Sequence, residues 1–160
     1  MKELTEYRSK LMERLVAAAH EFRTECLAVQ APYEPLGPGG WTTHQIAAHT
    51  RDVDKLVYGL RVRRTLAEDN PEFENFDGET NMAQHYSAGE PLDGILEELV
   101  SQVENLAATL RDLPPKAWAR GSSHVMLGRD LTLQSWVEKD LAHIEEHLDT
   151  VRNRPRDKQG

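Results

Sequence analysis

The sequence has a single cysteine, Cys26, so no disulfide can form within the chain. A lone cysteine is compatible with a reducing compartment, and we expect a cytoplasmic protein. No uninterrupted apolar stretch comes near the roughly 20 residues that a membrane-spanning helix needs. Charged residues also interrupt the N-terminal segment where a signal peptide would be apolar. These absences predict a protein that does not enter a membrane.

Basic residues are scarce as well. The 160 residues include 19 Lys and Arg against 27 Asp and Glu, which gives a net charge of −8. Because nucleic-acid binding depends on a basic face that neutralises phosphates, no nucleic-acid partner is expected. No internal repeat or linker divides the chain, so residues 1–160 are predicted to form one domain.

Apolar residues at helical spacing are abundant and occupy four long stretches. These stretches cover residues 2–29, 42–66, 92–113 and 131–153. Segments rich in proline and glycine separate them and favour turns, and one short extra helix is expected near Thr80–Tyr86. The sequence therefore predicts an all-α fold, a four-helix bundle with long loops. The polar segment after Val151 is expected to fray.

The second predicted helix has a clear start and carries a histidine on its apolar face. Thr42 followed by Gln45 is a capping box, which predicts that the helix begins here. Asp52 comes three residues after His49 and could orient its ring, or it could be an ordinary exposed acid. A lone histidine on such a face is equally consistent with a core residue that holds one hydrogen bond. The apolar residues predicted to share the face with His49 are Ile46, Val53, Leu56 and Leu60.

The last predicted helix carries two more histidines. His143 and His147 lie one turn apart, with roughly 5–6 Å between their Cβ atoms. Both imidazoles can therefore reach one divalent cation. They share a stripe with Trp136 and Asp140 beside the apolar face, and we expect this stripe to point toward a core or cleft. The alternative is a solvent-facing pair.

If the second and last helices pack together, three neutral imidazoles meet near one end of the bundle. Three protein ligands with an open position are typical of a catalytic metal site, whereas a structural zinc site has four ligands. His49, His143 and His147 are therefore the predicted ligands of a divalent ion. Zinc, nickel and iron all suit imidazole. No catalytic residue can be assigned from these patterns.

Several short motifs, taken together, resemble one known family. The motifs are Trp41–Thr42 before His49, DGETNMAQHY at 77–86, Trp118 in a loop, GRDLTL at 128–133 and HIEEHL at 143–148. Their order and spacing are similar to those of the DinB/YfiT-like superfamily over roughly residues 5–152. The similar branch contains mycothiol-dependent maleylpyruvate isomerases and bacillithiol transferases.

The resemblance implies a homodimeric bundle in which the three histidines hold the metal. It also implies transfer or isomerisation of a small-molecule substrate with a low-molecular-weight thiol, because a metal with an open position lowers the pKa of a bound thiol. The family often has an aspartate before its final histidine, where this chain has Glu146. Hypothetical partners of the ligating rings are Asp52, Asp140 and Glu146, and hypothetical pocket residues are His85, Trp118 and His124.

Two other interpretations stay open. The spacing of His143, Glu146 and His147 also matches the H-x-x-E-H pattern of inverted zinc peptidases, with Glu146 as general base. Only 13 residues follow His147, and they contain neither histidine nor glutamate to complete such a site. The second interpretation is a non-catalytic helical module that a metal ion stabilises for binding or regulation.

Overall fold

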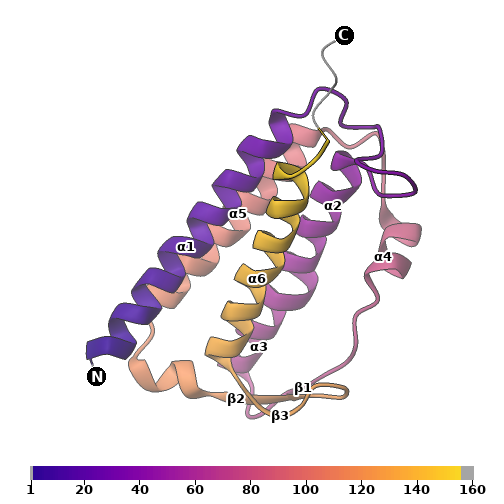
Figure 1. Cartoon of the computed structure of the whole chain (residues 1–160). Coiled ribbons are helices and arrows are strands. Elements are labelled where there is room, and N and C mark those ends of the chain that lie inside the picture. The colour runs from indigo at the N-terminus through magenta and orange to yellow at the C-terminus, as the bar shows by residue number, and fades with distance from the viewer. Residues whose placement is uncertain (1, 156–160) are drawn as a thin grey trace.

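The computed structural model describes residues 2–155 and shows four long helical rods packed side by side (Figure 1). The predicted four-helix bundle is confirmed. The first rod packs against the third and the fourth, and the second rod also packs against the third and the fourth. In chain order the rods are α1 (Lys2–Leu27), then α2 (Thr43–Val53) with η1 (Asp54–Tyr58) and α3 (Gly59–Ala67), then α5 (Leu92–Arg111), then α6 (Leu133–Arg152).

One continuous apolar core fills the space between the rods. Helical spacing places Leu15 and Phe22 of α1, Leu99 of α5 and Ile144 of α6 inside it, and none of them is exposed to solvent. Cys26 lies in the same core, and burial raises the pKa of its thiol to about 12. The cysteine is therefore a small buried apolar residue with no reactive thiolate.

Side-chain caps set the starts of the two helices that carry the histidines. Thr42 accepts a hydrogen bond from the backbone N–H of Gln45, and the Gln45 side chain accepts one from the backbone N–H of Thr42. The predicted capping box is thus confirmed. Thr132 caps α6 in the same way by accepting from Ser135 N–H.

The second rod contains a π-helical turn, η1, that the sequence analysis did not predict. The backbone N–H of Gly59 donates to the carbonyl of Asp54, five residues earlier. A Cβ at Gly59 would lie 2.7 Å from that carbonyl oxygen, so glycine permits the wide turn.

The extra residue in this turn rotates the rest of the rod. Leu56 and Leu60, predicted on the buried face, are each 43% exposed. Val57 and Arg61, each one residue later, are 5% and 7% exposed instead. The predicted face is therefore correct as far as Val53 and wrong beyond it, because an uninterrupted 3.6-residue period was assumed.

A small three-stranded sheet closes one end of the bundle, where α3 ends and α6 begins (Figure 1). Its strands are β1 (Glu72–Phe73), β2 (Gly121–His124) and β3 (Gly128–Thr132). β1 pairs in parallel with β2, and β2 and β3 form an antiparallel hairpin. The sequence predicted irregular structure for these segments and a helix from Leu131, because strands this short carry no detectable two-residue period; β3 instead continues to Thr132 and α6 begins at Leu133. The expected short helix is present as α4 (Gly78–His85) and packs against α2.

Among residues 2–155, no helix combines the length and the apolar composition needed to cross a membrane. α6 continues to Arg152, and most of the segment predicted to fray lies outside the described residues.

Candidate metal centre

Three histidine side chains from two rods meet between α2 and α6. The Nε2 atom of His143 lies 3.3 Å from Nε2 of His49 and 3.0 Å from Nε2 of His147. One nitrogen from each of the three rings lies within 4.8 Å of the others. Two nitrogens bound tetrahedrally to a zinc ion at 2.0–2.1 Å are separated by about 3.3 Å. The spacing of the rings therefore suits a single small cation.

Helix geometry explains why the rings converge. His143 and His147 are one turn apart on α6, so their imidazoles stand one above the other with ring centroids 4.5 Å apart. Trp136 and Asp140, which share their stripe, are fully buried, so this side of α6 does face the interior as predicted. His49 enters from α2, which packs against α6. Its ring centroid lies 5.2 Å from that of His143.

The surroundings of the cluster keep all three rings neutral. Burial, with a smaller contribution from the neighbouring His147, lowers the pKa of His49 to about 4. Burial lowers the pKa of His143 to about 3, with smaller contributions from His147 and His49. Burial also lowers the pKa of His147. At neutral pH each ring therefore has a free lone pair, which a metal ligand requires.

Unused nitrogen atoms separate this cluster from an ordinary set of core histidines. The Nδ1 atoms of His49 and His143 are buried, and neither has a hydrogen-bond partner within residues 2–155. His44, also on α2, is buried too, but its Nδ1 accepts from the Tyr86 hydroxyl and its Nε2 donates to the Glu90 carbonyl, both at 2.6 Å. The fold thus gives both nitrogens of His44 a protein partner, whereas within residues 2–155 the Nε2 atoms of the cluster face only one another, as the ligands of a single ion do.

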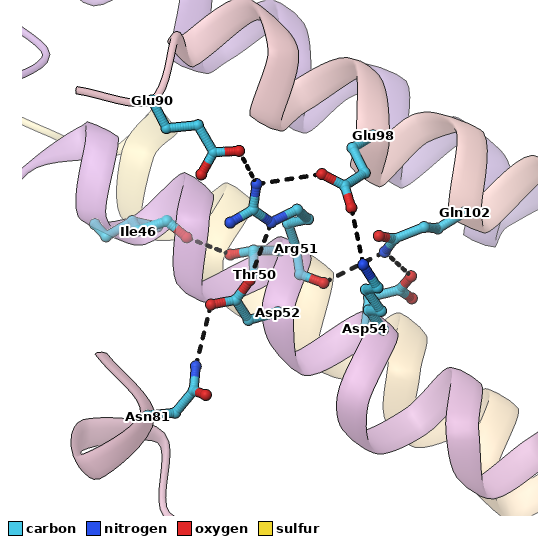
Figure 2. Close-up of polar contacts among 10 residues, drawn as sticks. Ile46, Thr50, Arg51, Asp52, Asp54, Asn81, Glu90, Glu98 and Gln102 are labelled. Atoms are coloured by element: carbon cyan, nitrogen blue, oxygen red, sulfur yellow. Dashed lines mark hydrogen bonds and ion pairs between the residues drawn. The ribbon is translucent and has the colours of Figure 1, made fainter. Parts of the chain in front are cut away.

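Asp52, a predicted partner of the ligating rings, is bonded elsewhere. Figure 2 shows its carboxylate held by Arg51, at 3.0 Å, and by the side-chain amide of Asn81, at 3.1 Å. Arg51 also pairs with Glu90 and Glu98. Asp52 does not orient His49 by a hydrogen bond, because Nδ1 of His49 has no partner within residues 2–155 and its Nε2 faces His143. Its charge only partly offsets the lowering of the His49 pKa.

Asp140, the second predicted partner, faces Asp54 of η1 and bonds to none of the three rings. Gln102 of α5 donates to Asp54 at 2.9 Å (Figure 2). Burial raises the pKa of Asp54, and burial together with the nearby Asp54 raises the pKa of Asp140 well above its ordinary value. No other donor reaches Asp140 from within residues 2–155, so the two carboxyl groups can bond only with a proton between them.

A cavity of about 320 Å³ opens beside His143. Glu146, the third predicted partner, is exposed and lies on the wall of this cavity without a hydrogen bond to any ring of the cluster. Tyr58 lies between the cavity and the cluster, with its ring centroid 5.9 Å from that of His143. The residues that line the cavity are Tyr58, Arg61, Leu127, Trp136, Lys139, Ala142, His143 and Glu146.

None of the three predicted pocket residues lines this cavity. His85 is exposed at the end of α4. Trp118 is only 3% exposed and packs into the apolar core, with the Arg8 guanidinium 5.3 Å from its ring centroid. His124 is 5% exposed, and its Nδ1 accepts the backbone N–H groups of Met126 and Leu127 at the hairpin turn. The structure gives these residues other positions, because Trp118 packs into the core, His124 accepts bonds at the hairpin turn and His85 is exposed on α4.

The sequence analysis missed several residues that shape the centre. An added Cβ at Gly78, the first residue of α4, would lie 2.9 Å from Cε1 of His49, so the absence of a side chain there makes room for the ring. Trp41 packs edge-on against the same ring, with centroids 5.0 Å apart. Tyr58 and Arg61 reach the cavity only because of the π-turn. Gly59 within a helical stretch was the one local signal of that turn.

The chain is similar to known proteins in sequence and in fold. The sequence model of the DinB superfamily matches residues 13–151, a range that includes all three histidines. Among solved structures, the fold is similar to that of YfiT from Bacillus subtilis, a probable metal-dependent hydrolase with an unusual four-helix bundle topology. The TM-score is 0.83, with 21% identity over 92% of this chain and 85% of that chain, a likeness that shows the fold alone. No curated protein sequence matches the chain significantly.

Proposed function

The chain belongs to the DinB superfamily, and on that premise we propose that it is an enzyme dependent on a divalent metal ion held by His49, His143 and His147. The observation that carries the proposal is the convergence of three neutral imidazoles, with Nε2 of His143 lying 3.3 Å from Nε2 of His49 and 3.0 Å from Nε2 of His147. Neutral imidazoles suit zinc, nickel or iron. In the described part of the chain no fourth histidine, cysteine or carboxylate joins the cluster, which suits a catalytic site with an open position.

When bound, such an ion lowers the pKa of a small nucleophile at its open position, so that the nucleophile is ionised at neutral pH. The chain's own contribution is to hold the three rings neutral and close together. Trp41 and Tyr58 shield the rings, and the cavity beside His143 has room for a small substrate. We infer that this substrate is a small molecule.

For the reaction we propose transfer or isomerisation that uses a low-molecular-weight thiol as the nucleophile. Support comes from the resemblance of the motifs around His49 and His143 to thiol-dependent members of the family. Hydrolysis is the second candidate, because Glu146 on the cavity wall could take a proton from water. The name of YfiT as a probable hydrolase agrees with this second candidate. On the resemblance we also propose a homodimer in the cytoplasm.

Metal content tests the first step of the proposal. Purified wild-type protein should carry about one divalent ion per chain, measured by elemental analysis after dialysis. His147→Ala should lose the ion. His20→Ala is the matched control, because His20 is an exposed histidine paired with Glu104 outside the cluster, and this variant should keep the ion. Equal metal content in all three proteins would remove the basis of the proposal.

Turnover tests the second step. The metal-loaded protein is incubated with bacillithiol, mycothiol or glutathione and an electrophile, and separately with a panel of esters and amides. Turnover that requires a thiol and disappears in His147→Ala supports transfer, whereas thiol-independent cleavage that disappears in Glu146→Gln supports hydrolysis. Metal-dependent stability without turnover in either panel would instead identify a structural ion in a non-catalytic module.

A further inference from the structure

Arg61 is a buried cation without a carboxylate partner. It is 7% exposed, and its guanidinium lies 4.7 Å from the centroid of the Trp136 ring. Among the residues that the structure describes, the one hydrogen bond that its guanidinium donates goes to the Glu74 carbonyl, at 3.1 Å. Within residues 2–155 it forms no ion pair, although six other arginines do. Those six are Arg14, Arg51, Arg64, Arg120, Arg152 and Arg154.

This burial is energetically unfavourable without an anion. Removing a charged group from water costs several kcal/mol unless an opposite charge compensates it. Burial correspondingly lowers the pKa of Arg61, and the group that counteracts this effect is Tyr58, not a carboxylate. Stacking on Trp136 and the bond to Glu74 hold the guanidinium plane in place. Its other N–H groups have no hydrogen-bond partner within residues 2–155, so they can bind a ligand.

A second unpaired cation lies on the same cavity. Lys139 of α6 is half-buried, lines the cavity with Arg61, and forms no ion pair to any residue between 2 and 155. The effect of both charges is visible at His124, whose pKa is lowered first by burial and then by Arg61, with a further contribution from Lys139. In a chain of net charge −8, this cavity is a local region of positive potential.

From this arrangement we propose that Arg61 and Lys139 bind a carboxylate of the substrate, so that the substrate of the adjacent metal centre is a small carboxylic acid. The proposal rests on the proposed function for what happens at the histidines, but the anion site stands on its own residues. In the metal-free protein, two cations and the Glu146 carboxylate leave one positive charge around the cavity, which matches a monoanion better than a phosphate dianion. An arginine fork also suits the planar geometry of a carboxylate.

Binding of simple probes tests the proposal directly. Butanoate is titrated into the full-length protein, with and without zinc, and followed by the indole N–H resonance of Trp136 in nitrogen-edited NMR spectra. That N–H donates to Ser122 at 2.7 Å, and its ring lies under Arg61, so it reports on the cavity. Saturable shifts are expected with butanoate and not with the neutral butanamide. Tighter binding of inorganic phosphate than of butanoate would overturn the assignment to a carboxylate.

Variants that remove single charges separate binding by Arg61 from a general effect of removing a positive charge. Arg61→Gln should weaken butanoate binding at least tenfold, and Lys139→Gln several-fold. Arg64→Gln is the matched control, because Arg64 lies on the same helix but pairs with Glu68, and it should bind as the wild type does. Glu146→Gln should tighten binding, which a purely structural role would not produce. If Arg61→Gln does not fold, Lys139→Gln and Glu146→Gln must still move the affinity in opposite directions.

The outcomes also distinguish this proposal from the metal centre. Binding that depends on Arg61 but is unchanged by zinc and by His147→Ala would support the anion site and count against a shared active site. Zinc binding with no butanoate response, or with equal affinity in Arg61→Gln, would overturn the anion site and leave the metal centre standing.

Discussion

Lowering the pH should destabilise the metal-free protein through His49. In the unfolded chain this ring takes up a proton near its ordinary pKa of 6.5, whereas in the folded protein burial keeps it neutral down to about pH 4. Between these values the unfolded state binds more protons. The free energy of unfolding therefore falls as the pH falls through this window, and the stability is fully present only above pH 6.5.

The size of the effect follows from the two pKa values. At 1.36 kcal/mol for each pH unit, the full loss approaches about 3 kcal/mol at low pH, and about 2 kcal/mol of it falls between pH 7 and pH 5. A glutamine at position 49 does not titrate, so His49→Gln should lose about 2 kcal/mol less than the wild type over this interval.

Urea unfolding of chelator-treated protein at pH 7, 6 and 5 measures this difference. His20→Gln, which removes an exposed imidazole paired with Glu104, should follow the wild type. With zinc in excess the wild-type loss should become steeper, because protons compete with the ion for the rings. Parallel stability curves for the wild type and His49→Gln would refute the argument that burial holds this ring neutral.

Three further predictions concern residues around the centre. Gly78→Ala should weaken zinc binding about tenfold in a competition titration, because the Cβ of the new alanine would press on the His49 ring. Gly94→Ala is the control and should not change the zinc affinity, because a Cβ at Gly94 meets open space. Asp140→Asn should raise the thermal midpoint at pH 8 and not at pH 4, because a raised carboxyl pKa means that the wild type loses stability as the pH rises. If the difference in thermal midpoint between the variant and the wild type is the same at pH 8 and pH 4, the two carboxyl groups do not share a proton. Ser122→Ala should cost about 1–3 kcal/mol in urea unfolding by leaving the buried indole N–H unpaired, and a neutral result would mean that water replaces the hydroxyl.

Local sequence patterns determined the helical bundle and the pairing of two of the three histidines of the centre. Apolar periodicity marked the four rods, and the Thr42 capping box marked the start of α2. The four-residue spacing of His143 and His147 placed both rings on one side of α6. These features could be predicted because they depend on backbone geometry within a few turns of one helix.

Only the tertiary structure decided what surrounds the histidines. The meeting of His49 with α6, the fit of Gly78 under its ring and the contact of Trp41 all join segments distant in sequence. The π-turn at Gly59 moved Arg61 inward, and no helical period anticipates a single inserted residue. Sequence spacing determines which residues share a helix face, whereas the packing of one face against another decides which charges are buried without a partner.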